Sequence, residues 1–306
     1  MKEFKKILVT GGAGFIASHF VDMCLEKGIA VVNYDAMKTG SMPEFGPDRV
    51  HPLYEFKQVD LAIDDYEIPY DVEAIVHFAA ETHVDRSLSD PLSFINSNIT
   101  GTYNLLNKMK SKKIRFHLVS TDEVYGDSAG SSEASTEDSP IVSSSPYSAS
   151  KAASEQLTMA WARTYGLDCT ITRGCNTIGA RQNKEKLFPK FIDNAQKRYP
   201  LPVYGDGTAM RQYMHVSDHV DGIFTVLTQA DTCRVYNLCS DQHYSINEIV
   251  TFLKQHYPTI TITDRENRPG HDMLYNISNA SIKRDLGWET KINGIDILVK
   301  SFEELN

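Results

Sequence analysis

The chain has 306 residues, of which 41% are hydrophobic and 23% are charged, a composition typical of globular rather than disordered or fibrous proteins. Its formal net charge of −9 argues against nucleic-acid binding, because a phosphate backbone requires clustered lysine and arginine. The sequence contains neither an apolar run of transmembrane length nor the pattern of a secretion signal. We therefore expect a cytoplasmic protein with no membrane and no nucleic-acid partner.

In the first half of the chain, short β-rich runs alternate with helical patterns. Strands are expected in KKILVT, AVVNYD, FKQVD, AIVHFAA, RFHLVS and DCTITR, and helices over about residues 14–27 and 93–110. This alternation is typical of a parallel, doubly wound sheet. It predicts an α/β fold in which residues 1–174 form a Rossmann-type nucleotide-binding domain.

From residue 175 onward the pattern changes to shorter strands, loops and helices. Helices are predicted over residues 187–199, 219–229 and 246–256, and extended segments in LPVYGDG, RVYNL and ITIT. We expect residues 175–306 to form mainly a smaller C-terminal substrate-binding lobe beyond the carboxyl ends of the strands, where ligands bind such sheets. Strands of the two parts can interleave. The polar segment 126–146 has the length usual for lids or disordered segments.

The five cysteines form an odd set without the spacing of a metal site. We expect reduced thiols and no bound metal. A disulfide between Cys233 and Cys239 is the less favoured reading, because disulfides are rare in the cytosol.

A glycine-rich segment, TGGAGFIAS, lies between the first strand and the first helix. Gly11 and Gly14 have no Cβ, so backbone N–H groups at the helix start can approach a pyrophosphate. A tight structural turn is the alternative, but the flanking strand and helix favour a dinucleotide site. Asp35, which ends the second strand, can bind ribose hydroxyls and favours NAD over NADP. Lys38 lies close enough to weaken that preference.

Tyr147 and Lys151 are four residues apart on a predicted helix, so they share one face. An ammonium group beside a phenol favours phenolate and would lower the tyrosine pKa. Tyr147 could then accept a hydroxyl proton while hydride passes to a nicotinamide. A surface pair is the ordinary alternative, but the dinucleotide motif and the strand ending at Ser120 favour the catalytic reading.

Four segments, TGGAGFIAS, HFAAETHVDRS, STDEVYG and YSASK, resemble the extended short-chain dehydrogenases/reductases that act on nucleotide sugars. The acid pair after Thr121 resembles the nucleotide-sugar 4,6-dehydratases, especially the dTDP-glucose type. This resemblance continues through CNTIGARQNKEKLFPKFI, LPVYGDGTAMRQYMHVSDH and NRPGHDMLY, and so covers nearly the whole chain. It implies NAD-dependent conversion of a nucleoside-diphosphate hexose to its 4-keto-6-deoxy derivative, and a homodimer formed by helices near residues 93–110 and 147–165.

The resemblance implies that Glu123 removes the C5 proton and that Asp122 protonates the departing C6 hydroxyl. These tasks need one ionised and one protonated carboxyl group, and burial with mutual repulsion can separate their pKa values. A pair that only caps the next helix is the structural alternative. The implied catalytic residues are Thr121, Asp122, Glu123, Tyr147 and Lys151.

The resemblance also implies a set of binding residues. Contacts with NAD are expected from Gly11, Gly14, Phe15, Ile16, Asp35, Lys38, Asp60, Leu61, Ala79, Ala80, Asn98, Tyr147 and Lys151. Contacts with the sugar nucleotide are expected from His83, Thr121, Asn176, Glu185, Lys186, Leu187, Arg211, Asn247, Arg268, His271 and Tyr275. Arg211 and Arg268 suit the diphosphate because a guanidinium group binds phosphate oxygens in pairs, and His271 and Tyr275 are expected near the nucleoside.

The chain departs from the family pattern at three places. Ala17 replaces a glycine, RGCNTIGA replaces NCSNNYGP, and NKEKL replaces FPEKL. UDP-glucose and UDP-N-acetylglucosamine therefore remain as credible as dTDP-glucose. Two other functions stay open: a nucleotide-sugar epimerase or UDP-glucuronate decarboxylase that uses only Tyr147 and Lys151, and a catalytically silent NAD-binding regulatory protein.

Overall fold

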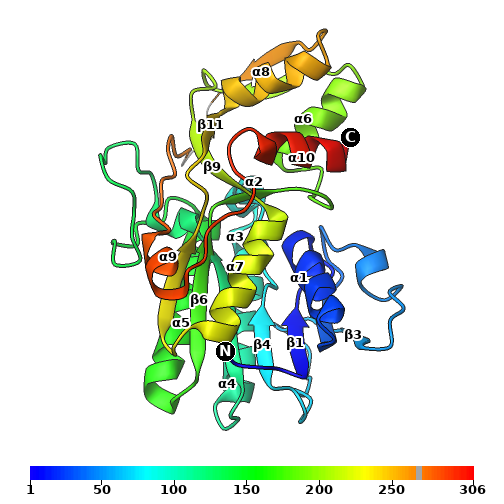
Figure 1. Ribbon diagram of the computed structural model, residues 1–306, viewed down its shortest axis with the longest axis vertical. Helices are drawn as coiled ribbons and strands as arrows, with labels where there is room; N and C mark the ends of the chain where they lie inside the picture. The colour runs from blue at the N-terminus through cyan, green and yellow to red at the C-terminus, as the bar shows by residue number, and fades with distance from the viewer. Residues whose placement is uncertain (267–270) are drawn as a thin grey trace.

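The computed structural model describes residues 1–266 and 271–306. A parallel seven-stranded sheet forms the larger part of the molecule (Figure 1), with the strand order β10-β6-β5-β4-β1-β2-β3. Its strands are β1 (Lys6–Thr10), β2 (Ala30–Asp35), β3 (Tyr54–Gln58), β4 (Ala74–His77), β5 (Arg115–Thr121), β6 (Cys169–Gly174) and β10 (Arg234–Leu238). The α/β Rossmann-type prediction is confirmed.

Helices cover both faces of this sheet. Helices α1 (Phe15–Glu26) and α7 (Val216–Gln229) pack together on one face, whereas α4 (Gly101–Met109) and α5 (Pro146–Tyr165) cover the other. Alternate residues of β1 serve the two cores: Ile7 and Val9 pack on the α1 side, and Leu8 on the α4 side. This alternation follows from the two-residue repeat of a strand.

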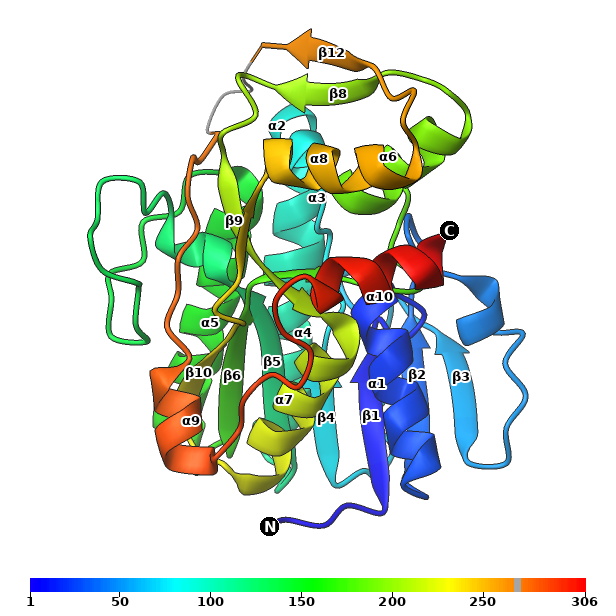
Figure 2. The ribbon, with the colours of Figure 1, turned by 45° about the horizontal axis from the view of Figure 1, so that its top comes forward.

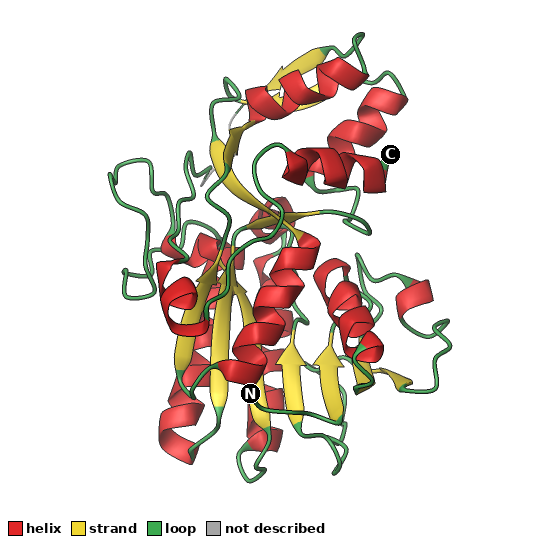
Figure 3. Cartoon of the chain, viewed as in Figure 1, coloured by secondary structure: helices red, strands yellow, loops and turns green. Residues whose placement is uncertain are grey.

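The C-terminal lobe lies beyond the carboxyl ends of the strands, toward which the arrowheads of the large sheet point (Figures 2 and 3). Strands β7 (Asn176–Ile178), β9 (Met210–His215) and β11 (His243–Ser245) form one small sheet, and β8 (Leu201–Tyr204) pairs with β12 (Ile262–Arg265). Helices α6 (Leu187–Gln196), α8 (Ile246–His256) and α10 (Asp296–Leu305) enclose a separate core that includes Phe188 and Phe252.

The chain after residue 175 does not stay within this lobe. Strand β10 and helix α7 return to the large sheet, and α9 (Ala280–Leu286) packs against β10. The predicted division at residue 174, with NAD bound before it and the nucleotide sugar bound mainly after it, therefore stays a prediction.

The helix predicted over residues 93–110 is interrupted. Short helices α2 (Val84–Ser89) and α3 (Pro91–Phe94) lead into a π-helical turn, η2 (Ile95–Thr100), before α4 begins. The side chain of Asn98 in this turn donates to the Glu81 carbonyl oxygen (3.0 Å) and to Ser150 Oγ (2.8 Å). These partners lie far away in sequence, so the helical pattern alone could not reveal the wider turn.

The segment 126–146 is tied down along its length. Ser128 N donates to Leu274 O (2.9 Å), and Ser135 N donates to Asn276 O (2.8 Å). The Asp127 carboxylate accepts from the backbone N–H groups of Met273 and Leu274. Backbone pairing with residues 273–278 orders this segment, and its movement as a lid stays a prediction.

All five cysteines are free thiols. Within residues 1–266 and 271–306, no helix is long and apolar enough to cross a membrane, and no cluster of three metal-ligating side chains occurs.

Candidate active site

The turn between β1 and α1 forms a cradle for a phosphate group. Gly11 has a φ of 71°, and a Cβ at this position would lie 2.8 Å from the backbone of Ala79. Helix α1 begins with Gly14 as its N-cap, and it has neither a side-chain cap nor an acidic residue in its first turn. The N–H groups of Phe15 and Ile16 are thus placed as an anion-binding helix start, which fits the pyrophosphate of NAD.

Asp35 is buried at the end of β2 and turns its carboxylate toward the glycine-rich turn. It accepts hydrogen bonds from Ala13 N (3.0 Å), Met37 N (2.8 Å) and Ser41 Oγ (2.8 Å). A carboxylate has about four acceptor sites, so one remains for a ribose hydroxyl. Lys38 forms an ion pair with Asp60 (Nζ–Oδ2 2.7 Å), and its effect on the preference for NAD stays a prediction.

The other residues expected to bind NAD lie around the same edge of the sheet. Ala79 and Ala80 directly follow β4, and Ala79 N donates to Thr10 Oγ1 (3.3 Å). Leu61 is buried beside β3. Asn98 is buried, and its side-chain amide is hydrogen-bonded to the backbone of Glu81 and to Ser150. Its contact with the cofactor stays a prediction.

Helix α5 positions the tyrosine–lysine pair. Ser145 caps its start: Ser145 Oγ accepts from Ser148 N (3.1 Å), and Ser148 Oγ accepts from Ser145 N (3.0 Å). Tyr147 and Lys151 follow on successive turns, and both are buried. Lys151 Nζ donates to Val119 O on β5 (2.8 Å), which holds the helix against the sheet at the reaction centre.

The expected lowering of the Tyr147 pKa by Lys151 is not found. Burial raises the pKa of Tyr147, the charges of Glu123 and Asp122 add to this rise, and a hydrogen bond from Thr121 opposes it. Burial lowers the pKa of Lys151 to about 8, against the effect of Glu155. The sequence pattern missed this result because it showed neither the burial nor the two carboxyl groups facing the phenol.

The acid pair lies in η3 (Asp122–Tyr125), a short 3₁₀ helix directly after β5. Thr121 caps this helix, since its Oγ1 accepts from Glu123 N (3.3 Å) and contacts Asp122 Oδ1 (3.2 Å). The carboxyl groups are therefore not needed as caps. Burial, together with the charge of Glu123, raises the pKa of Asp122 to about 8, so Asp122 is protonated at neutral pH. Its Oδ2 is buried without a hydrogen-bond partner.

A cavity of about 200 Å³ lies beside the acid pair and extends into the C-terminal lobe. The sequence-predicted residues that line it are His83, Glu123, Asn176, Glu185, Lys186, Leu187, Arg211, His271 and Tyr275. Asn247 does not line it; its side chain donates to Asp206 O (2.9 Å) and supports the turn at Gly207. Arg268 lies outside the described residues.

Arg211 is buried at the wall of this cavity and lies 4.2 Å from the centre of the Tyr275 ring. Its guanidinium donates to Met210 O (2.7 Å) and Asp272 O (2.7 Å). Tyr275 in turn donates to Asp272 Oδ2 (2.6 Å). These contacts orient the guanidinium. Its positive charge also lowers the pKa of Asp122, against the larger effects of burial and of Glu123. The same cation therefore lines the cavity and influences the acid pair.

Sequence reasoning missed several lining residues: Val84, Asp85, Lys190, Phe191, Pro202, Tyr204, Ala209, Tyr213 and Ile246. Two signals were available. Lys190 lies four residues after Lys186, which gives two cations at one helical face. Pro202 and Tyr204 occupy alternate positions of LPVYGDG, so they face the same side of a strand. With Arg211, the two lysines give the cavity three cationic side chains, beside the three acidic ones of Asp85, Glu123 and Glu185.

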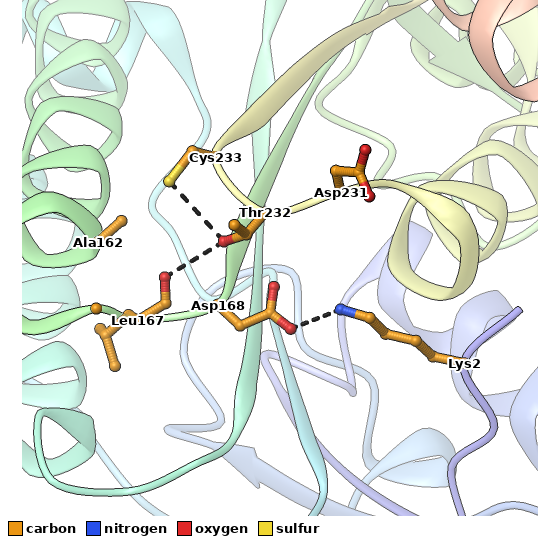
Figure 4. Close-up of a pocket in the computed structure, with 8 residues that line it drawn as sticks. Lys2, Ala162, Leu167, Asp168, Asp231, Thr232 and Cys233 are labelled. Atoms are coloured by element: carbon orange, nitrogen blue, oxygen red, sulfur yellow. Dashed lines mark hydrogen bonds and ion pairs between the residues drawn. The ribbon is translucent and has the colours of Figure 1, made fainter.

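A second hollow lies at the opposite ends of β6 and β10 (Figure 4). Cys233 and Thr232 border it, and an ion pair joins Lys2 Nζ to Asp168 Oδ2 at 2.6 Å. None of the residues expected to bind NAD or the sugar nucleotide lines this hollow.

The family model described as GDP-mannose 4,6 dehydratase matches residues 8–301. The chain belongs to this family. The dTDP-glucose 4,6-dehydratase of Neisseria meningitidis serogroup B is 40% identical over 93% of this chain and 88% of its own length. That of Haemophilus influenzae is 39% identical over 94% and 93%.

Solved structures with the same fold include dehydratases and epimerases. The dTDP-glucose 4,6-dehydratase DesIV of Streptomyces venezuelae, solved with NAD and dTDP bound, has a TM-score of 0.91 and 35% identity over 98% of this chain and 96% of that one. A UDP-glucuronic acid 4-epimerase from Bacillus cereus, solved with NAD, has a TM-score of 0.89 and 25% identity, with 98% of both chains covered. Dehydratases and epimerases therefore share this fold, and only residues in the site can distinguish which of the two reactions the chain catalyses.

Proposed function

We propose that this member of the GDP-mannose 4,6 dehydratase family removes water from a nucleoside-diphosphate hexose and yields the 4-keto-6-deoxy sugar, with NAD as its cofactor. The observation that carries the proposal is the Asp122–Glu123 pair. Asp122 is buried and protonated at neutral pH, while Glu123 faces the cavity. Oxidation at C4 by itself requires only Tyr147 and Lys151. An epimerase or a decarboxylase would therefore not need the Asp122–Glu123 pair.

The geometry supports one role for each residue. Tyr147, in its phenolate form, accepts the C4 hydroxyl proton; Thr121 is hydrogen-bonded to Tyr147, and Lys151 lies one turn further along α5. When bound, NAD supplies the group that takes hydride from C4 and returns it to C6. Before C6 can be reduced, Glu123 removes the C5 proton, which the C4 ketone makes acidic, and Asp122 donates its proton to the C6 hydroxyl, which leaves as water. Glu123 returns a proton to C5 when C6 is reduced. The overall reaction releases water without net oxidation.

The cations around the cavity suit a diphosphate. Arg211, Lys186 and Lys190 are among the residues that line it, and guanidinium and ammonium groups are the usual phosphate ligands. The relatives named dTDP-glucose 4,6-dehydratases favour dTDP-glucose as the substrate. UDP-glucose and UDP-N-acetylglucosamine are the other two candidates.

The proposal is tested by incubating the NAD-loaded enzyme with these three sugar nucleotides and with UDP-glucuronate. A product lighter by one water, with the alkali-induced absorbance of a 4-keto-6-deoxy sugar, is the expected result. A product of unchanged mass would indicate an epimerase, and loss of carbon dioxide from UDP-glucuronate would indicate a decarboxylase. Absence of turnover on all four would favour the silent NAD-binding protein.

The pH dependence of elimination should report Asp122. Because its pKa lies at about 8 and only the protonated form can act as the acid, the rate of water loss should fall as the pH rises through this value. Lys151 also has a pKa of about 8, so formation of NADH should be followed separately. Asp122→Asn should be slower overall and should lack the alkaline fall in elimination. An unchanged alkaline fall in this variant would contradict the assignment.

We also propose a homodimer and a cytoplasmic location. Leu92, Ile95, Tyr103 and Tyr165 are each more than 40% exposed on the face formed by α3, η2, α4 and α5, and Trp161 contacts both tyrosine rings. A second copy packing on this face would bury these side chains in a four-helix arrangement. Sedimentation should show a dimer at micromolar concentration, and Ile95→Arg should shift it toward the monomer. A monomeric wild type would disprove the dimer.

A further inference from the structure

Arg173, near the carboxyl end of β6, is buried together with its partners. Its Nη2 donates to Glu155 Oε2 (2.7 Å), and its Nε donates to both Glu155 oxygens (3.1 and 3.2 Å). Both side chains of this ion pair are less than 7% exposed. Glu155 follows Tyr147 and Lys151 at four-residue intervals on α5, so all three share one helix face.

The same guanidinium also holds the segment that carries the acid pair. Arg173 Nη1 donates to the hydroxyl of Tyr125 (2.7 Å), the last residue of η3. Tyr125 in turn donates to Asn237 Oδ1 on β10 (2.7 Å). Thr121 caps the start of η3, and Tyr125 fixes its end, so Asp122 and Glu123 lie between two anchored points.

The long segment 126–146 joins this arrangement through Glu137. Its carboxylate accepts from Asn237 N (2.8 Å) and Ser281 Oγ (2.9 Å), and its carbonyl oxygen lies 3.4 Å from Arg173 Nη1. We call Tyr125, Glu137, Glu155, Arg173 and Asn237 the Arg173 cluster. It connects η3, α5, two strands and the segment between the catalytic motifs.

We infer that Arg173 is a positioning residue for the proposed dehydration: one guanidinium fixes the acid pair of η3, through Tyr125, relative to the Tyr147–Lys151 pair of α5, through Glu155. The inference rests on the proposed function. Arg173 does not line the cavity, so it can act on the reaction only through the residues that it binds. The charge of Glu155 also raises the pKa of Lys151, against the larger effect of burial.

The two stages of the reaction depend differently on this link. Oxidation at C4 uses Tyr147 and Lys151, both on α5, whereas elimination also needs Asp122 and Glu123 at the correct separation from the same sugar. Small misplacements of catalytic groups are costly; about 1 Å can reduce a rate by about 10²-fold. Loosening the link should therefore slow elimination more than oxidation, and enzyme-bound NADH should accumulate.

Tyr125→Phe is the mildest test, because it removes one hydroxyl and leaves the Arg173–Glu155 ion pair intact. In single-turnover experiments, NADH should form at close to the wild-type rate, and loss of water should slow by about tenfold, the scale of one hydrogen bond. Arg173→Lys keeps the charge but cannot bind both partners, so it should slow elimination by about 10²-fold. Arg173→Met combined with Glu155→Gln avoids an unpaired buried charge if Arg173→Lys fails to fold.

Arg115→Lys is the matched control. Arg115 is also a buried arginine of the large sheet, and it joins Asp168 to the carbonyl oxygens of Val226 and Ala230 at the opposite end of the strands. Its loss should lower the melting temperature and leave the ratio of the oxidation rate to the elimination rate unchanged. If Tyr125→Phe and Arg173→Lys also leave this ratio unchanged, the positioning role is wrong. If the wild type forms no dehydrated product, the proposed function fails instead, which is a separate result.

Discussion

Tyr147→Phe should nearly abolish oxidation at C4 while NAD still binds. The change removes only the phenolic proton acceptor, and general acid–base catalysis is typically worth about 10²–10⁴-fold in rate. The ring itself remains packed against Phe94, with the ring centres 6.2 Å apart, so the helix should keep its place. Stopped-flow absorbance of NADH after mixing with substrate measures the oxidation, and a fluorescence titration measures NAD affinity.

Tyr165→Phe is the control for this variant. Tyr165 ends the same helix, but its ring is about half exposed and packs against Trp161. Its replacement should leave oxidation at the wild-type rate. If Tyr147→Phe also keeps near-normal turnover, another group accepts the proton, and the reaction centre on α5 has been assigned wrongly.

Glu123→Gln should stop the reaction after oxidation. Tyr147 and Lys151 remain intact, so NADH should accumulate on the enzyme. Without the carboxylate, exchange of the C5 hydrogen with deuterated solvent should slow by about 10²–10⁴-fold. Mass spectrometry of the recovered sugar nucleotide measures this exchange.

Asp122→Asn should separate the acid from the base. Elimination should slow, but C5 exchange should continue because Glu123 remains in place. Changes of only a few-fold in both variants would place the pair outside the chemistry. If both variants dehydrate the sugar at the wild-type rate, other groups act as the acid and the base, and the roles assigned to Asp122 and Glu123 are wrong.

Much of the fold could be predicted because it depends on local patterns. The alternation of β-rich runs and helices, and the glycine-rich turn after the first strand, indicated the doubly wound sheet and the phosphate cradle. The interrupted helix near Asn98 could not be predicted in this way. Asn98 in its π-helical turn is hydrogen-bonded to Glu81 and Ser150, and the helical repeat of the sequence does not reveal these contacts.

In the candidate site, too, local features could be predicted from the sequence, whereas features that depend on distant residues could not. The motif around Tyr147 and Lys151 predicted a shared helix face, whereas the direction of the Tyr147 pKa shift depends on burial and on carboxyl groups from another element. The pairing of segment 126–146 could not be predicted because its partners, residues 273–278, lie more than a hundred positions away. The cavity residues Lys190 and Tyr204 carried a readable signal, but only the folded chain brings them together.

The return of β10 and α7 to the large sheet limits how the molecule can be divided. Helix α7 covers one side of α1 through contacts such as Phe20 with Phe224, and β10 supplies the edge next to β6. A fragment cut at residue 174 would lose both and expose apolar surface on its sheet. A chimera that takes its sugar-binding half from a relative should therefore fold only if β10 and α7 stay with the large sheet. The segment that can be exchanged is smaller than residues 175–306.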